Sequence, residues 1–286
     1  MNILITGATG FIGSHITEAL SKNGHKVTVC VRDVIAANKR WPGVKTIPVD
    51  FVMDNQLSNW LDRLEGIDVV INAVGIIREK GKQTFTTLHT VTPIALFKAC
   101  EEKGVKRVIQ VSALGADENA FVSYQTSKKA ADDVLRTLSL DWFILRPSLV
   151  YGEEGTSTRF FNLLASLPLL PLIDRGKQLI QPVHIDDLVD VVLACLSCVN
   201  TKQTIDVVGP ESFTLAEWLQ RLRTKKGRGK LYIVPLPNVL MQKMAHVLKH
   251  VIPLFTPDNL KMLQQGNVAS SEALNTLLGR KPHELP

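Results

Sequence analysis

The sequence has few cysteines and no long apolar run, and both absences narrow the class of protein. Only four cysteines occur among 286 residues, and Cys30 and Cys100 lie in apolar stretches, which favours reduced core thiols in a reducing compartment. The longest nearly apolar run, residues 163–173, contains two prolines and is much shorter than the ~20 residues of a spanning helix. Because a strand already begins at Asn2, we expect no secretory signal. The expected location is cytoplasmic, with contact to the inner face of a membrane left open.

Dense charge is scarce as well. Lys and Arg number 33 against 27 Asp and Glu, and the only concentrated basic stretch is residues 224–230, with Tyr232 nearby. A nucleic-acid site needs a broader basic face with interleaved aromatic residues, so we predict no nucleic-acid partner. Cys195 and Cys198 have redox-motif spacing inside an apolar helical stretch, but one such pair cannot complete a four-ligand zinc site. No metal site is predicted.

The first half of the chain alternates apolar strand-like runs with helical segments. The strand-like runs are residues 3–6, 27–31, 46–49, 69–72, 107–111 and 142–145, and the helical segments are residues 12–22, 57–64, 90–103 and 123–138. Such alternation is typical of a parallel sheet with helices on both faces. Several of these strands are apolar throughout, as strands buried on both sides are. The sequence therefore predicts an α/β fold with a doubly wound parallel (Rossmann) sheet.

After Pro147 the pattern loosens. We expect helices over residues 160–167, 186–196 and 215–223, the last capped by Thr214, and strands over residues 181–185 and 205–208. We interpret residues 1–150 as a dinucleotide-binding core. Residues 151–286 would form a smaller, discontinuous C-terminal lobe packed on that core, over the carboxyl ends of the strands where ligands bind in open α/β sheets.

Three glycines follow the first strand at every third position. Gly7 would allow the tight turn, Gly10 would let backbone N–H groups approach a pyrophosphate, and Gly13 would permit close packing of helix on sheet. The helix that begins near Phe11 offers its positive end to phosphates. The sequence therefore predicts a dinucleotide site at this turn.

The end of the second strand bears on the choice of coenzyme. An acidic side chain at this place pairs with the ribose hydroxyls of NAD, whereas an arginine suits the 2′-phosphate of NADP. Both types are present, but Arg32 lies nearer the strand end than Asp33 and makes charge-assisted bonds to phosphate. We therefore expect NADP(H) in preference to NAD(H).

Several motifs along nearly the whole chain carry a family resemblance. They are TGATGFIG at residues 6–13, Asp50-Phe51 with Asp54, NAVG at 72–75, GVKRVIQVS at 104–112, YQTSK at 124–128, LRPSLVYG at 145–152 and VHIDDL at 183–188. Together they resemble the short-chain dehydrogenase/reductase superfamily in its extended or atypical branches. The resemblance, with the glycine turn and Arg32, implies these cofactor-binding residues: Gly7, Thr9, Gly10, Phe11, Ile12, Gly13, Arg32, Asp50, Phe51, Ala73, Val74, Gly75, Val111, Lys128, Pro147 and Val150.

Tyr124 and Lys128 carry the expected chemistry. They are four residues apart and project from one face of a helix. A free tyrosine titrates near 10, and we expect the nearby ammonium to lower the pKa of Tyr124 toward a range useful for acid–base work. The resemblance implies that Tyr124 exchanges a proton with a substrate carbonyl and that Lys128 also binds the nicotinamide ribose. Ser112 is the tentative group that polarises the carbonyl.

Two departures from the family pattern favour other functions. The hydroxyl residues usual after Ser112 are replaced by Ala113 and Leu114, and His89 stands where extended members usually carry asparagine. The departures and the C-terminal tail resemble an atypical subgroup that includes the dinucleotide-binding accessory subunit of respiratory complex I. The main expectation is an NAD(P)-dependent oxidoreductase for a carbonyl or sugar-nucleotide-like small molecule. A noncatalytic NAD(P)H-binding accessory or assembly factor and a redox sensor are the alternatives.

Residues 238–252 form an amphipathic pattern. Leu240, Met244, Val247, Leu248 and Val251 recur at helical spacing on one face, and basic residues lie largely elsewhere. We expect this face to pack on the core of the lobe, with contact to a membrane surface or a protein partner as the alternative. The pattern leaves the oligomeric state open.

Overall fold

The computed structural model describes residues 1–248, 252 and 254–285, and the chain divides into two compact units. The first unit contains Met1–Arg146 and Val189–Ile205, and the second contains Pro147–Leu188 and Asp206–Pro286. The chain therefore leaves the first unit after Arg146 and returns to it at Val189 for a helix and the start of a further strand.

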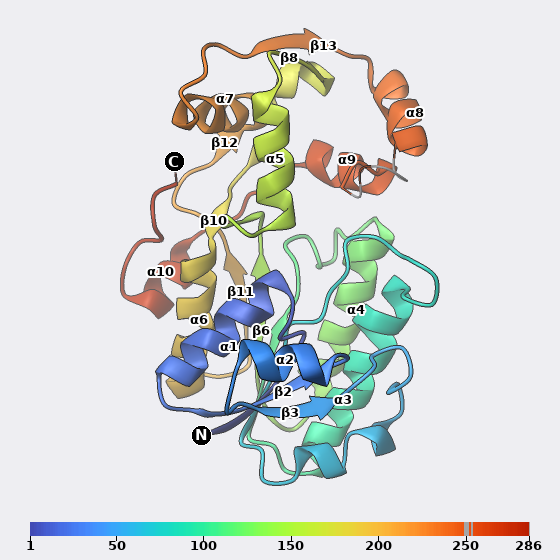
Figure 1. Ribbon diagram of the computed structural model, residues 1–286, viewed down its shortest axis with the longest axis vertical. Helices are drawn as coiled ribbons and strands as arrows, with labels where there is room; N and C mark the ends of the chain where they lie inside the picture. Colours follow the sequence, from blue (N-terminus) through green and yellow to red (C-terminus); the bar gives the residue numbers. More distant parts are fainter. Residues whose placement is uncertain (249–251, 253, 286) are drawn as a thin grey trace. The chain divides into compact units, whose positions relative to one another are not determined.

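A seven-stranded sheet forms the centre of the first unit (Figure 1). Its order is β11-β6-β5-β4-β1-β2-β3, and the pairings from β6 through β3 are parallel. The strands are β1 (Asn2–Thr6), β2 (Lys26–Val31), β3 (Lys45–Pro48), β4 (Val69–Asn72), β5 (Arg107–Val111), β6 (Asp141–Pro147) and β11 (Gln203–Val207). Val70, Ile71, Val108 and Ile109 are fully buried. The predicted doubly wound sheet is confirmed.

Helices cover both sides of this sheet, α1 and α2 on one side and α3 and α4 on the other (Figure 1). Their bounds are Phe11–Lys22, Val34–Arg40, Thr92–Glu102 and Ser123–Thr137, in that order. The predicted helices at 12–22, 90–103 and 123–138 are confirmed with small shifts. Helix α2 went unpredicted because it is short and buries only Ala37, so it has no apolar periodicity to detect.

Two segments differ from ordinary α-helix. The helix predicted over 57–64 is wrong: the chain forms two 3₁₀ turns there, Leu57–Asn59 and Asp62–Leu64. Between them Trp60 is fully buried and its indole N–H donates to the carbonyl of Asp54 at 2.9 Å. Before α3, Thr86–Val91 forms a π-helical turn, a feature often found at functional sites.

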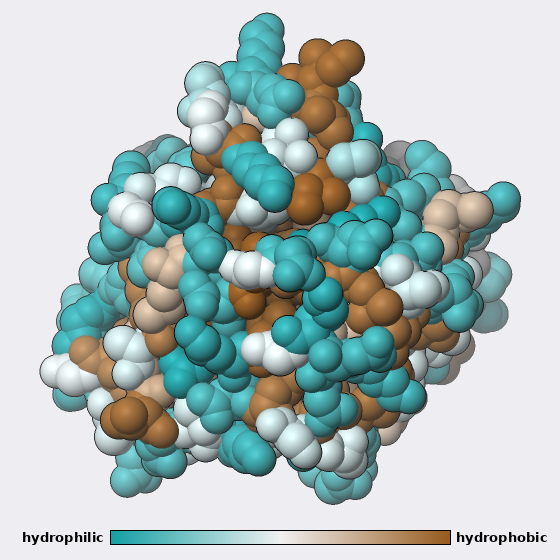
Figure 2. Space-filling model, turned by 90° about the horizontal axis from the view of Figure 1, so that it is seen from below, coloured by the Kyte–Doolittle hydropathy of each residue, from teal (hydrophilic) through white to brown (hydrophobic). Residues whose placement is uncertain are grey.

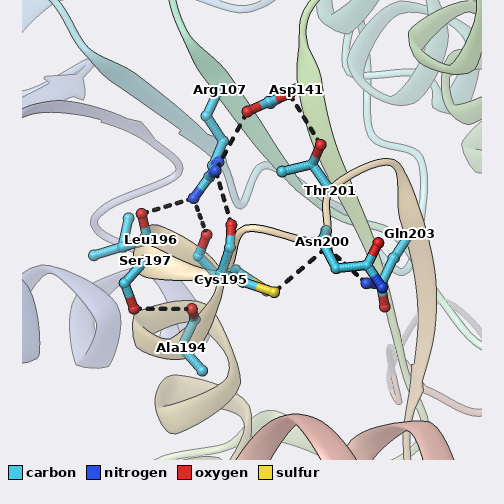
Figure 3. A network of polar contacts seen from close by, with 10 residues as sticks. Arg107, Asp141, Ala194, Cys195, Leu196, Ser197, Asn200, Thr201 and Gln203 are labelled. Atoms are coloured by element: carbon cyan, nitrogen blue, oxygen red, sulfur yellow. Dashed lines mark hydrogen bonds and ion pairs between the residues drawn. The ribbon is translucent and has the colours of Figure 1, made fainter.

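A single arginine connects the end of α6 (Ile185–Ser197) to the sheet by hydrogen bonds (Figure 3). Arg107, the first residue of β5, donates from its guanidinium to the carbonyls of Cys195 (2.6 Å), Leu196 (2.7 Å) and Cys198 (3.0 Å). It also contacts the carboxylate of Asp141 at 3.3 Å. The last carbonyls of a helix have no partner within the helix and carry partial negative charge, so this cation caps α6.

The second unit contains three small strand pairs and two packed helices. The pairs are β7 (Val150–Tyr151) with β10 (Val183–His184), β9 (Leu179–Ile180) with β12 (Phe213–Thr214), and β8 (Leu169–Leu172) with β13 (Tyr232–Pro235). Helices α5 (Thr156–Ser166) and α7 (Leu215–Lys225) pack around Trp218. The predicted cap of α7 is confirmed, because Thr214 and Glu217 form a reciprocal capping box.

Three further helices follow in the second unit: α8 (Asn238–Leu248), α9 (Pro257–Gln265) and α10 (Glu272–Leu278). The prediction that Leu240 and Val247 pack on the core is wrong. Helix α8 instead buries Met241 and Ala245, which lie one turn apart, whereas the side chains of Leu240 and Val247 are exposed. Val251, also assigned to the packed face, lies outside the described residues.

The C-terminal tail is held by one buried carboxylate. Asp187 is fully buried and accepts hydrogen bonds from the guanidinium of Arg280 at 2.7 Å and from the backbone and ring of His283 at 2.9 and 2.8 Å. The predicted His-x-x-Asp segment thus anchors the tail. The face of the molecule in Figure 2 is mostly hydrophilic, with apolar residues showing between polar side chains. Over the described ranges, no helix combines the length and the apolar character needed to cross a bilayer.

Candidate dinucleotide and catalytic site

The first feature of the site is the place where the strand order reverses. The chain runs from β1 outward to β2 and β3, and then returns to β4 on the other side of β1. Gly7 follows β1 with a φ of +73°, and a Cβ there would lie 2.6 Å from the carbonyl carbon of Ala73, which follows β4. Only glycine allows this approach. Ligands of open α/β sheets bind at such a reversal.

The other two glycines have different physical requirements. A Cβ on Gly13 would lie 2.1 Å from the carbonyl oxygen of Gly7, so α1 packs directly on the turn. A Cβ on Gly10 would meet that oxygen at 3.2 Å, and the φ of −77° at Gly10 suits any residue. Helix α1 has no side-chain cap, and Thr9 and Gly10 are exposed in front of it. This uncapped N-terminus with bare backbone before it fits a diphosphate.

The end of β2 separates the two candidate coenzyme-selecting residues. Asp33 is the N-cap of α2, and its carboxylate accepts a hydrogen bond from the backbone N–H of Ala36 at 2.9 Å. Arg32 is exposed. Because α2 forms, the carboxylate of Asp33 already has a hydrogen-bond partner in that helix, whereas the side chain of Arg32 faces solvent.

The segment after β3 is a tight, self-bonded turn. The carboxylate of Asp54 accepts from the backbone N–H of Asp50 at 2.8 Å and from the guanidinium of Arg63 at 3.1 Å. The ring of Phe51 packs edge-on against Trp60 with centroids 5.6 Å apart. The side chain of Phe51 is thus part of the core, and its carbonyl accepts a hydrogen bond from the hydroxyl of Thr92 at 2.6 Å.

A buried polar row crosses the carboxyl ends of three strands. Asn72 on β4 accepts a hydrogen bond from the hydroxyl of Thr6 on β1 at 2.6 Å and donates to the side chain of Gln110 on β5 at 2.7 Å. All three are fully buried. Buried polar groups need partners, and this row supplies them to the hydroxyl of Thr6 and to the amide of Asn72.

Lys128 lies at the end of this row. It is buried, and its ammonium donates to the carbonyl oxygens of Val74 at 3.0 Å and Val111 at 2.9 Å. A Cβ on Gly75 would lie 3.4 Å from its Nζ. Burial lowers the pKa of Lys128 to about 8, and the carboxylate of Asp132 opposes that shift. The structure therefore places the ammonium between the loops that follow β4 and β5.

Tyr124 is half-buried one turn before Lys128. Its ring packs edge-on against Phe85 and His89, with centroid distances of 5.9 and 5.5 Å. The expected lowering of its pKa is wrong for this structure, because burial raises the pKa of Tyr124 to about 12 and the ammonium of Lys128 is committed to two carbonyl oxygens. At neutral pH this side chain is a phenol.

His89 has a positioning role that the sequence did not reveal. Its Nε2 accepts from the backbone N–H of Ile76 at 3.0 Å, so its Nδ1 carries the proton toward the hydroxyl of Ser127 at 3.1 Å. That hydroxyl in turn contacts the carbonyl of Tyr124 at 3.0 Å. Burial, with the charge of Lys128 as a smaller cause, lowers the pKa of His89 to about 2. The only signal in the sequence was the departure from asparagine at this position.

Ser112 is buried, and its hydroxyl makes a short hydrogen bond to the carboxylate of Asp132. Asp132 is itself fully buried on α4, one turn after Lys128. Burial raises the pKa of Asp132 to about 6, against the opposing effects of Ser112 and Lys128. Ser112 thus bonds to a carboxylate that the sequence analysis did not single out, since Asp132 lies within an ordinary helical stretch.

The predicted site residues before position 130 all belong to the first unit. Pro147 ends β6, and Val150 lies in β7, where it pairs with Val183 of the second unit. Throughout the described part of the chain, no group of three or more His, Cys, Asp or Glu side chains is placed to hold a metal ion.

A doubly wound sheet with a glycine turn at its reversal point defines a nucleotide-binding Rossmann protein. A family model described as NAD(P)H-binding matches residues 7–167, and the chain belongs to this family. Its fold is oxidoreductase- and epimerase-like, and the comparisons confirm the resemblance to the extended and atypical short-chain dehydrogenase/reductases.

The chain is similar in sequence to relatives of two kinds, a reductase and a subunit of NADH-ubiquinone oxidoreductase. The chain is 29% identical over 243 residues to the ceramide reductase of Caulobacter vibrioides, covering 83% of this chain and 75% of the relative. It is 25% identical to the mitochondrial NADH-ubiquinone oxidoreductase 40 kDa subunit of Neurospora crassa, covering 94% and 72%. A nucleoside-diphosphate-sugar epimerase structure from Staphylococcus aureus has a TM-score of 0.80 at 19% identity, covering 99% of this chain and 98% of that chain.

Proposed function

We propose that this protein is an NADP(H)-dependent reductase of a carbonyl compound. The diphosphate would bind the backbone of residues 9–12, and Arg32 would contact the 2′-phosphate. The backbone of Asp50 and Phe51 would face the adenine, and Ala73, Val74, Gly75 and Val111 would line the path to the nicotinamide. Lys128 would bind the nicotinamide ribose.

The observation that carries this proposal is the position of Lys128. Its ammonium bonds to the carbonyl of Val74, after β4, and to that of Val111, the last residue of β5. Val74 in turn lies beside Gly7 in the glycine turn that follows β1. The ammonium of Lys128 thus forms hydrogen bonds to two neighbouring strand ends beside the point where the strand order reverses. A buried ammonium at such a place is suited to a hydrogen bond with a ribose hydroxyl.

The proton chemistry would fall to Tyr124. Bound reduced coenzyme supplies a hydride, which carries two electrons to the carbonyl carbon. The phenol of Tyr124 donates its proton to the carbonyl oxygen, so that an alcohol forms and a phenolate remains until solvent reprotonates it. A pKa of about 12 keeps Tyr124 protonated before the reaction, but it also makes the phenol a weaker acid than a group whose pKa lies near neutral pH.

Tyr124→Phe tests this role. We expect NADPH oxidation with a panel of aldehydes and ketones to fall about 10²- to 10⁴-fold, as for loss of a general acid, while the thermal stabilisation by NADPH is retained. Unchanged turnover in the variant would rule out Tyr124 as the proton donor. Lys128→Met should weaken both turnover and NADPH binding, because Lys128 is assigned to both.

A specific observation also favours a noncatalytic accessory function. The hydroxyl of Ser112 is bonded to Asp132, and Ala113 and Leu114 offer no replacement donor for a substrate carbonyl. A related protein is a subunit of NADH-ubiquinone oxidoreductase. In this case NADP(H) would be a structural ligand, and the outer surface of α8 would contact a partner or a membrane. NADPH that stabilises the chain but is not consumed with any carbonyl tested would support this alternative.

A further inference from the structure

The second unit exposes apolar side chains on a strand pair where polar ones are expected. In this pair, β8 runs parallel to β13 with Leu169 opposite Tyr232 (Figure 1). Leu170 and Leu172 belong to the core of the unit, whereas Leu169 is 56% and Tyr232 is 63% exposed. A strand with one solvated face normally alternates apolar and polar residues. The outer side of this pair lacks that alternation.

The neighbouring elements extend the apolar surface. Leu163 of α5 and Leu167, which follows the last residue of that helix, are exposed just before β8 begins. Helix α8, which follows β13 directly, exposes Val239, Leu240 and Val247, the last at 71%. Exposed apolar side chains thus occur on successive segments of this unit, and apolar residues gathered at a surface are typical of an interaction site.

Charge of one sign accompanies this surface. Residues 224–257 contain no Asp or Glu, while Lys225, Lys230 and Lys243 are exposed within that range. The acid-free segment includes β13 and α8. Any ligand of this surface therefore meets positive charge without compensating carboxylates from the same segment.

The cations also lie beside the apolar residues of α5. Lys226 donates from its ammonium to the carbonyl of Asn162 at 2.9 Å, and Arg228 donates to the carbonyl of Ser166. Both carbonyls belong to the turn of α5 that carries the exposed leucines. Basic and apolar groups thus share one end of this helix.

We propose that this surface docks on an anionic lipid bilayer. We define the basic apolar face as the end of α5, β8, β13, residues 225–230 and the outer side of α8. Cations near an anionic membrane contribute about 1 kcal/mol each, and apolar side chains enter the boundary between headgroups and acyl chains. Apart from Tyr232, the exposed apolar side chains named on this face are aliphatic and provide no stacking platform for bases, so the composition favours lipid over nucleic acid. The inference goes beyond the proposed reductase activity and holds whether or not the site turns over.

Vesicle flotation with the full chain tests the proposal. We expect binding to phosphatidylcholine vesicles that contain phosphatidylglycerol, weaker binding to pure phosphatidylcholine, and release by high salt. The double variant Lys230→Glu/Lys243→Glu should bind anionic vesicles at least about tenfold more weakly. The matched control Lys22→Glu/Lys39→Glu makes the same charge change at exposed positions of the first unit and should bind like the unaltered chain.

A second variant tests the apolar part of the face. Tyr232→Ser/Val234→Ser should reduce vesicle binding while the melting temperature stays close to that of the unaltered chain, because both side chains are exposed. Equal binding to neutral and anionic vesicles, no binding to either, or equal weakening in the charge control would overturn the proposal. Binding of an RNA oligonucleotide without vesicle binding would also overturn it and assign the face to nucleic acid.

Discussion

At the scale of single residues, burial determines the protonation states of three titratable side chains on or beside α4. His89, Lys128 and Asp132 are all buried, and burial is the largest cause of the pKa shift in each. The ammonium of Lys128 and the carboxylate of Asp132 support each other's charged forms. His89 stays neutral and acts only through its hydrogen bonds.

Replacing His89 should change the acid sensitivity of the fold. The pKa of His89 is about 2 in the folded chain and near 6.5 when unfolded. The unfolded state therefore binds the extra proton as pH falls below about 6.5, and stability is lost by on the order of 3 kcal/mol near pH 4. His89→Asn should lose less stability between these pH values, measured by urea unfolding at each pH. Parallel pH curves for variant and unaltered chain would contradict this assignment.

Replacing Asp132 should act on Lys128. The carboxylate raises the pKa of Lys128, opposing the effect of burial, so Asp132→Asn should move that pKa below about 8. If NADPH binding depends on the protonated ammonium, its affinity should then decline at a lower pH than in the unaltered chain. Asp133→Asn is the control, because Asp133 is half-buried and pairs instead with Lys129 and Arg136. If the pH dependence of NADPH affinity is the same in Asp132→Asn as in the unaltered chain, the coupling between Asp132 and Lys128 is contradicted.

At the scale of elements, the glycine turn separates packing from binding. Gly13→Ala places a Cβ 2.1 Å from a backbone oxygen and should destabilise the chain by about 2–4 kcal/mol. In Gly10→Ala the new Cβ would lie 3.2 Å from that oxygen, so the melting temperature should stay nearly unchanged. The added methyl group would cover backbone N–H groups of the turn and should therefore weaken NADPH binding. Thermal unfolding with and without NADPH measures both effects. A Gly13→Ala chain as stable as the unaltered one would contradict the packing role.

The cap of α6 should matter to stability more than the surface charge beside it. Arg107→Ala leaves the carbonyls of Cys195, Leu196 and Cys198 without their cation, which should cost about 3 kcal/mol in urea unfolding. Lys106→Ala is the control, because the side chain of Lys106 is 78% exposed in its pair with Asp68; its loss should cost at most about 1 kcal/mol. Equal losses in the two variants would remove the capping interpretation of Figure 3.

At the scale of the whole molecule, coenzyme binding should stabilise the native chain by mass action. A ligand at a hundred times its Kd adds about 2.7 kcal/mol, which corresponds to a rise in melting temperature of roughly 5–10 °C for a chain of this size. We expect NADPH to give a larger rise than NADH, and Arg32→Gln to reduce the difference. Equal responses to both coenzymes would contradict the role of Arg32, and no response to either would contradict the dinucleotide site itself.

Much of the first unit could be predicted from the sequence. Apolar runs alternating with helical segments revealed the strands and long helices, and the glycine spacing marked the turn after β1. Short elements were missed where they lack periodicity, as in α2, or where one buried side chain such as Trp60 shapes the turn. The role of Asp33 as the N-cap of α2 followed only from the existence of that helix.

The sequence by itself determined the fold class, the family and the position of the dinucleotide turn, because these depend on local periodicity and on spacing along the chain. Only the tertiary structure decided that Ser112 bonds to Asp132, that His89 joins the loop after β4 to α4, and which side of α8 is buried. Those outcomes depend on contacts between residues far apart in sequence and on desolvation, and neither leaves a local pattern in the chain.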